Sequence, residues 1–108
     1  MVVSLINNQP LEKIEYYILE NKKPVKTEDT IEWAKWFKRE ENWYVAKDII
    51  KDIQIITFFQ GLITEGLPKL FQTMVIGGQL DGEYEKYSTW QEAEAGHKRM
   101  VERVKSNQ

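Results

Sequence analysis

The chain contains no cysteine and a single histidine, His97. The lack of cysteine excludes disulfides, thiolate nucleophiles, zinc ribbons and iron–sulfur clusters. No apolar run approaches the roughly 20 residues of a membrane-spanning helix. The opening Met-Val-Val-Ser-Leu-Ile run lacks the basic start and the length of a secretory signal. These absences predict a cytoplasmic protein that holds no metal and no cofactor and does not enter a membrane.

The sequence also lacks an excess of positive charge. Lys and Arg total 15 against 17 Asp and Glu, which gives a formal net charge of −2. General nucleic-acid binding depends on a positive field, so this balance argues against it. Lys22, Lys23 and Lys26 gather around Pro24, but a solvated turn explains them better than a phosphate-binding patch.

Aromatic side chains, in contrast, are abundant: four Trp, five Tyr and four Phe in 108 residues. This length permits one domain with one core, and aromatic residues bring enough buried area to make a small core feasible. A domain of this size rarely buries four indoles completely, so we expect one or two of them at an interface or pocket. The binding candidates are therefore Trp33, Trp36, Trp43 and Trp90.

The hydrophobic pattern predicts an α+β fold. Residues 1–13 are weakly patterned and are expected to form an N-terminal arm, while residues 14–105 form a single domain. Within this domain the pattern predicts strands at 16–19, 43–46, 53–59, 70–76 and 83–87, and helices at about 29–40 and from 89 to about 104. The expected architecture is an antiparallel β-meander of about four to five strands with two helices on one face, in the order β-α-β-β-β-β-α.

Local signals define several of these elements more closely. Gly77-Gly78-Gln79-Leu80-Asp81-Gly82 is typical of a hairpin turn, and Thr89-Trp90-Gln91-Glu92 has the spacing of a helix capping box. Gly96 interrupts the last helix, which indicates that a neighbouring strand approaches closely there. Both faces of strand 53–59 carry apolar residues, so we expect it to be central and covered on both sides.

Three motifs carry a family resemblance: WAKWF at 33–37, LFQTMVIGG at 70–78 and YSTWQEAEAGH at 87–97. They resemble a family of small proteins encoded by bacteriophages and prophages, whose members read WAxWF, LFETMVFGG and YSTWEEAEAGH at these places. The resemblance covers roughly residues 16–104. It implies a genomic context in a bacterial host and no particular mechanism.

The chain departs from that family at one loop. Members often carry a Gly-Leu-Asp-His-like loop followed by a Gly/Pro-rich run between the central strands. Here Gly61-Leu62 is followed by Ile63-Thr64-Glu65, so the acid and the imidazole are both missing. A metal-binding or acid–base role of that loop is therefore not expected in this protein.

His97 is the one residue with obvious acid–base potential. It could act as a general base or a ligand-binding donor, but no constellation of nucleophile or metal ligands is spaced around it. We favour the simpler interpretation that His97 lies on the apolar stripe of the last helix and bonds a backbone carbonyl. The sequence thus predicts no catalytic residue and no metal ligand.

Three functions from different classes remain open. The first is a non-catalytic interaction protein that engages a host or phage protein in the host cytoplasm through exposed aromatics, with counter-defence as one setting. The second is a binder of a small nucleotide, with aromatic stacking and phosphate contacts from Arg99, Arg103, Lys98 or the helix start at Thr89. The third is a minor enzyme built on His97. A polar edge strand and surplus aromatics also lead us to expect a homodimer.

Overall fold

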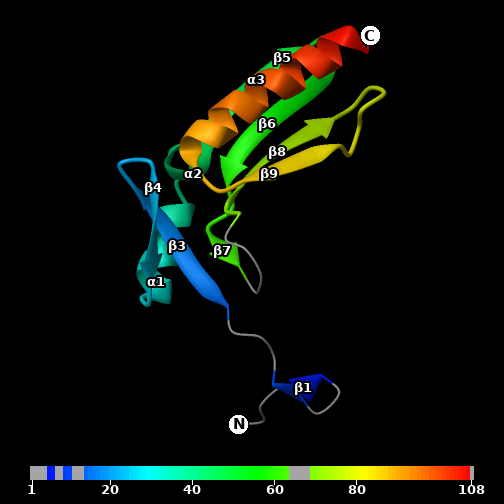
Figure 1. Cartoon of the computed structure of the whole chain (residues 1–108). Helices are drawn as coiled ribbons and strands as arrows, with labels where there is room; N and C mark the ends of the chain where they lie inside the picture. Colours follow the sequence, from blue (N-terminus) through cyan, green and yellow to red (C-terminus); the bar gives the residue numbers. More distant parts are fainter. Residues whose placement is uncertain (1–4, 7–8, 11–13, 64–68, 108) are drawn as a thin grey trace.

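The computed structural model describes residues 5–6, 9–10, 14–63 and 69–107 (Figure 1). The described elements are, in chain order, β1 (Leu5–Ile6), β2 (Gln9–Pro10), β3 (Glu15–Glu20), β4 (Lys23–Thr27), α1 (Thr30–Phe37), α2 (Glu40–Trp43), β5 (Tyr44–Ile50), β6 (Ile53–Phe59), β7 (Leu62–Ile63), β8 (Phe71–Ile76), β9 (Tyr84–Tyr87) and α3 (Trp90–Ser106).

The strands form antiparallel sheets of different sizes. The main sheet has four strands in the order β5-β6-β8-β9, and a smaller sheet has the order β4-β3-β7. Helix α3 lies along one face of the main sheet and contacts all four of its strands, whereas α1 packs against β3 (Figure 1). Among the described residues, no helix is long and apolar enough to cross a membrane. The α+β class predicted from the sequence is confirmed.

In the central strands of the main sheet, buried side chains alternate with more exposed ones, as in a strand that has one covered face. Ile55, Thr57 and Phe59 of β6 are fully buried, and their direct partners Val75, Thr73 and Phe71 on β8 are buried with them. We call this the inner face, which α3 covers. The opposite, outer face carries the intervening side chains: Tyr44, Lys47, Ile49, Gln54, Ile56, Phe58, Gln72, Met74, Ile76, Tyr84 and Lys86.

Two hydrophobic clusters fill the interior. The first joins the two sheets, because Phe59 and Phe71 of the main sheet pack with Tyr17 and Leu19 of β3 and with the aromatic residues of α1. The second lies between the far end of α3 and the main sheet, around Ile55, Val75, Met100 and Val104. The larger aromatic side chains therefore lie where the two sheets meet.

Helix α3 begins and packs as its sequence predicts. The Thr89 hydroxyl accepts from the Glu92 N–H, and the Glu92 carboxylate accepts from the Thr89 N–H, so both halves of the capping box form. Ala93, Gly96, His97, Met100 and Val104 are its buried residues. A Cβ atom on Gly96 would overlap the ring of Tyr87 on β9, which confirms the predicted close approach of a strand.

The N-terminal half differs from the prediction. Lys23–Thr27 forms strand β4, not a solvated turn, because Asn21 and Lys22 adopt φ values of 51° and 67° that close a tight hairpin with β3. Pro24 is compatible with β4 because that strand lies at a sheet edge. The predicted single meander is consequently divided into two sheets, and the two long helices lie on different sheets.

Two further expectations concern strand β6 and the N-terminal arm. Strand β6 is central, as predicted, but within the part of the chain that the structure describes its outer face has no second layer: Ile49, Ile76 and Tyr84 on that face are 62%, 43% and 60% exposed. Within the predicted arm of residues 1–13, only β1 and β2 are described, and they pair with each other. The rest of that arm and residues 64–68 of the departing loop lie outside the described residues.

Candidate functional site

An aromatic cluster forms where α1 and α2 meet the end of β6. Phe37 stacks on Phe59 with ring centroids 6.2 Å apart and on Trp43 at 6.5 Å, while Trp36 meets Phe59 edge-on at 5.8 Å. The Trp33 and Trp43 indole N–H groups donate to the carbonyls of Gly61 and Phe37, each at 3.0 Å. Because these polar groups already have partners, the cluster presents an apolar surface.

Beside this cluster lies a groove of about 580 Å³, which we call the aromatic groove. Among the described residues, the polar side chain of Gln60 lines it, together with the apolar side chains of Phe37, Trp43, Ile56, Phe58, Phe59 and Leu62. Ligand sites commonly occupy about 300–1,000 Å³ and combine an apolar lining with few polar groups. The groove therefore has the size and chemistry of a site for apolar or aromatic groups.

Gly61 makes this arrangement of the groove possible. Its φ of +77° favours glycine, and a Cβ atom there would overlap the ring of Phe37. Its carbonyl accepts from both the Tyr17 N–H at 2.7 Å and the Trp33 indole at 3.0 Å. A residue without a side chain thus lets Phe37 form the wall of the groove and ties α1 to the end of β6.

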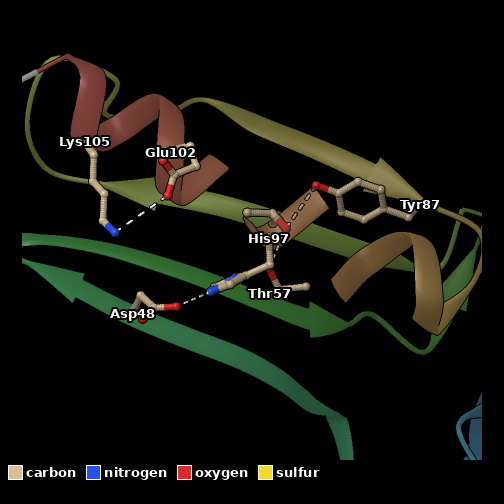
Figure 2. Close-up of polar contacts among 7 residues, drawn as sticks. Asp48, Thr57, Tyr87, His97, Glu102 and Lys105 are labelled. Carbon is tan, nitrogen blue, oxygen red and sulfur yellow. Dashed lines mark hydrogen bonds and ion pairs between the residues drawn. The ribbon is translucent and has the colours of Figure 1, made fainter. Parts of the chain in front are cut away.

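A second feature is a hydrogen-bonded network between α3 and the main sheet. The His97 Nε2 atom lies 2.7 Å from Asp48 Oδ2, and His97 Nδ1 lies 2.7 Å from the Thr57 hydroxyl (Figure 2). The Thr57 hydroxyl also bonds the Thr73 hydroxyl, which accepts from Tyr87 at 3.1 Å. Tyr87 in turn lies 2.9 Å from Glu85 Oε1. The network thus crosses all four strands.

The network joins six side chains through five contacts and ends in a carboxylate on each side, Asp48 at one end and Glu85 at the other. A hydroxyl group can both donate and accept, so Thr57, Thr73 and Tyr87 continue the hydrogen bonding from α3 to β9.

Access to this network is limited to its two ends. The side chains of Asp48 and Glu85 are 54% and 37% exposed, while Thr57 and Thr73 are completely buried. Asp48, His97 and Thr57 have the order of a nucleophilic triad, but a buried Thr57 hydroxyl offers no approach to an acyl substrate. The geometry therefore supports a role in fixing α3 to the sheet.

The pKa of Tyr87 reflects its position. Burial raises that pKa to about 12, the Glu85 carboxylate adds to the rise, and the hydrogen bond with Thr73 opposes it. The pKa of Tyr44, at the other edge of the sheet, is also raised by burial and by nearby Glu40 and Asp48. Both phenols are thus held in their neutral, hydrogen-bonding form.

The structure separates the binding residues predicted from the sequence. Trp43 lines the aromatic groove, and Trp33 and Trp36 support it, but Trp90 packs elsewhere, against Phe71 at 6.2 Å with the Lys22 ammonium 5.1 Å from its ring centre. All four indoles are half-buried.

The predicted phosphate contacts lie away from the groove. Arg103 pairs with Glu83 at 3.0 Å and Arg99 with Glu85 at 3.7 Å, both at the β9 edge of the sheet. The N–H groups at the start of α3 bond Thr89 and Glu92 of the same chain. Within the described ranges, no three acidic or histidine side chains converge as metal ligands.

His97 is buried on the apolar stripe, as predicted, but the predicted backbone partner is wrong. Its partners are the side chains of Thr57 and Asp48. Two inward-facing threonines among apolar strand residues were an available signal for a buried polar network. The partner Asp48 lies 49 residues from His97 and carried no such signal.

Comparison of the chain with family models, with curated proteins and with solved structures gives no significant match. The resemblance to phage-encoded proteins therefore stays a prediction.

Proposed function

We propose that this protein is a non-catalytic interaction protein whose aromatic groove receives apolar side chains of a partner protein. The observation that carries this proposal is the groove itself: it has a volume of about 580 Å³, and its described lining consists of six apolar side chains and one glutamine. Each large apolar side chain that a partner buries there contributes about 1.5–3 kcal/mol. A few such contacts are enough for a specific complex once the cost of association is met.

The setting of this interaction rests on the family resemblance. We propose that the protein is phage- or prophage-encoded and engages a host or phage protein in the bacterial cytoplasm, with counter-defence as one purpose. The aromatic cluster supports the binding part of this proposal, because it fixes the groove walls before a partner arrives. Pre-formed walls lower the ordering cost of binding.

The decisive test places a charge in the groove. Leu62 is 39% exposed and lines the groove, so Leu62→Arg should abolish partner binding while leaving the fold intact. Ile31 on α1 is 70% exposed and lies outside the groove lining, so Ile31→Arg is the matched control. A partner found by crosslinking in the bacterial host should bind purified wild type and Ile31→Arg equally in calorimetry. Equal binding by Leu62→Arg would refute the proposal.

A small apolar ligand is the second candidate occupant, because the groove volume also suits one. Its aromatic lining favours a flat, apolar molecule over a nucleotide, since Arg99 and Arg103 pair with glutamates away from the groove. A native mass spectrum of protein purified from its host separates the two candidates. Extra mass of a few hundred daltons on wild type and not on Leu62→Arg would identify a ligand.

A further inference from the structure

The outer face of the main sheet extends the apolar surface beyond the aromatic groove. Ile56 and Phe58 belong to both the groove lining and the outer face. From Ile56, direct strand neighbours continue across β8 and β9 through Met74 to Tyr84. This apolar surface therefore runs from the groove across β6, β8 and β9. In the adjacent row the exposed side chains of Ile49 and Ile76 lie on either side of Gln54.

The strand positions of this face carry charges of one sign, and two glutamates lie beside one end of it. The outer-face positions include two lysines, Lys47 on β5 and Lys86 on β9, and no carboxylate, although the whole chain is acidic. Among the described residues neither lysine forms an ion pair. Glu40 and Glu41 line a hollow beside Lys47, so the Lys86 edge is the more basic of the two.

The inner face of the main sheet shows that one helix can cover a sheet of four strands. There a single helix, α3, contacts all four strands and places Arg103 3.0 Å from Glu83 at the β9 edge. On the outer face the sign is reversed, because β9 presents Lys86. Three strand spacings of about 4.8 Å separate the two edges by about 14 Å, which accommodates a helix of about 10 Å diameter between the two lysines.

We propose that the outer face binds an amphipathic helix of the partner protein, with apolar residues toward the groove and acidic residues on its flanks toward Lys86 and Lys47. This inference rests on the proposed function and adds the chemistry of the partner. A second copy of this chain fits less well, because the strand positions of both faces would bring lysines and no carboxylate, and Glu40 and Glu41 of each copy already lie beside its own Lys47. Single-stranded nucleic acid fits poorly as well, because the strand positions of this face carry two lysines while the chain as a whole is acidic.

The test uses a displayed library of 17-residue helical peptides with a fixed leucine stripe and randomised flanks. Selection on the wild-type protein should enrich Asp and Glu on the flanks. The best synthetic peptide should bind at least tenfold more weakly to Lys86→Glu in fluorescence anisotropy. Lys98→Glu is the matched charge reversal on α3, away from the outer face, and should leave the affinity unchanged.

Each remaining outcome decides between the two proposals. Selected peptides with neutral or basic flanks whose binding is lost in Leu62→Arg would overturn the acidic helix and keep the proposed function. If no selected peptide loses binding in Leu62→Arg, both the acidic helix and the proposed function are overturned. If the protein sediments as a dimer and Lys86→Glu strengthens that dimer, the face binds a second copy of the chain. If a 15-nucleotide oligothymidine binds tightly to wild type and not to Lys86→Glu, the face binds single-stranded nucleic acid.

Discussion

At the scale of single residues, Tyr87 connects the edge strand β9 to the buried threonines beneath α3. Its hydroxyl lies 3.1 Å from Thr73 and 2.9 Å from Glu85, and the residue is only 6% exposed. A phenol in such a place resists ionisation, because the phenolate would lose water and face the Glu85 carboxylate. The free energy of unfolding is therefore coupled to the ionisation of this side chain.

This coupling predicts a loss of stability at alkaline pH. The pKa of Tyr87 is raised from 10.0 to about 12, so the folded state holds the proton more tightly than the unfolded chain. The stabilisation is complete below pH 10 and is lost as pH rises toward 12, by up to about 3 kcal/mol at about 1.4 kcal/mol per pKa unit. Urea unfolding at pH 8, 10 and 11.5 measures it.

Tyr87→Phe is the control for that prediction. It should be less stable than wild type by about 1–2 kcal/mol at pH 8, because Thr73 loses a buried partner. Its stability should then fall less steeply above pH 10. Tyr17 and Tyr44, whose pKa values burial also raises, account for the slope that remains. Parallel pH profiles of the two proteins would show that Tyr87 contributes nothing to this dependence.

At the scale of elements, the contact between α3 and β9 depends on the missing side chain of Gly96. An Ala in a helix interior normally stabilises by about 1 kcal/mol relative to Gly. Here its Cβ would overlap the Tyr87 ring, so Gly96→Ala should instead destabilise by about 1–3 kcal/mol. Thermal unfolding compares it with Ala95→Gly, an exposed neighbour that should lose about 1 kcal/mol from helix propensity alone. A stabilised Gly96→Ala would contradict this packing.

The elements also show why sequence reasoning reached part of the fold. Helix α3 was predictable because its capping box and apolar stripe are local signals within 89–104. The β3–β4 hairpin was missed because its turn uses Asn21 and Lys22 at positive φ in place of glycine. Strand β5 continues through Lys47 and Asp48 to Ile50, beyond its predicted end at Ala46. Its Asp48 faces inward, where the side chain meets His97.

The candidate site was less predictable, because it depends on contacts between residues that are distant in the sequence. Trp43 could be selected from composition alone, since a small domain rarely buries every indole. Phe37, Phe58 and Leu62, however, come together from three elements that only the tertiary structure brings to one groove. Neither residue spacing nor charge pattern in the sequence indicated that combination.

At the scale of the whole molecule, the two sheets are joined through the aromatic cluster around Phe37. That ring packs on Phe59 of the main sheet, while the preceding turns of α1 pack on β3. Wild type should therefore unfold in one transition, because the smaller sheet and the main sheet share a core.

Phe37→Ala should break this cooperativity. Removing the ring costs about 3–5 kcal/mol and leaves the smaller sheet with little to pack against. Near-ultraviolet circular dichroism, which reports Trp33, Trp36 and Trp43, should then lose its signal at lower urea than the NMR resonances of His97 on the main sheet. Ile31→Ala, at a 70% exposed position of the same helix, should keep the two probes coincident. Coincident loss in Phe37→Ala as well would mean that contacts other than this ring couple the sheets, and the groove wall would then be less dependent on Phe37 than its packing indicates.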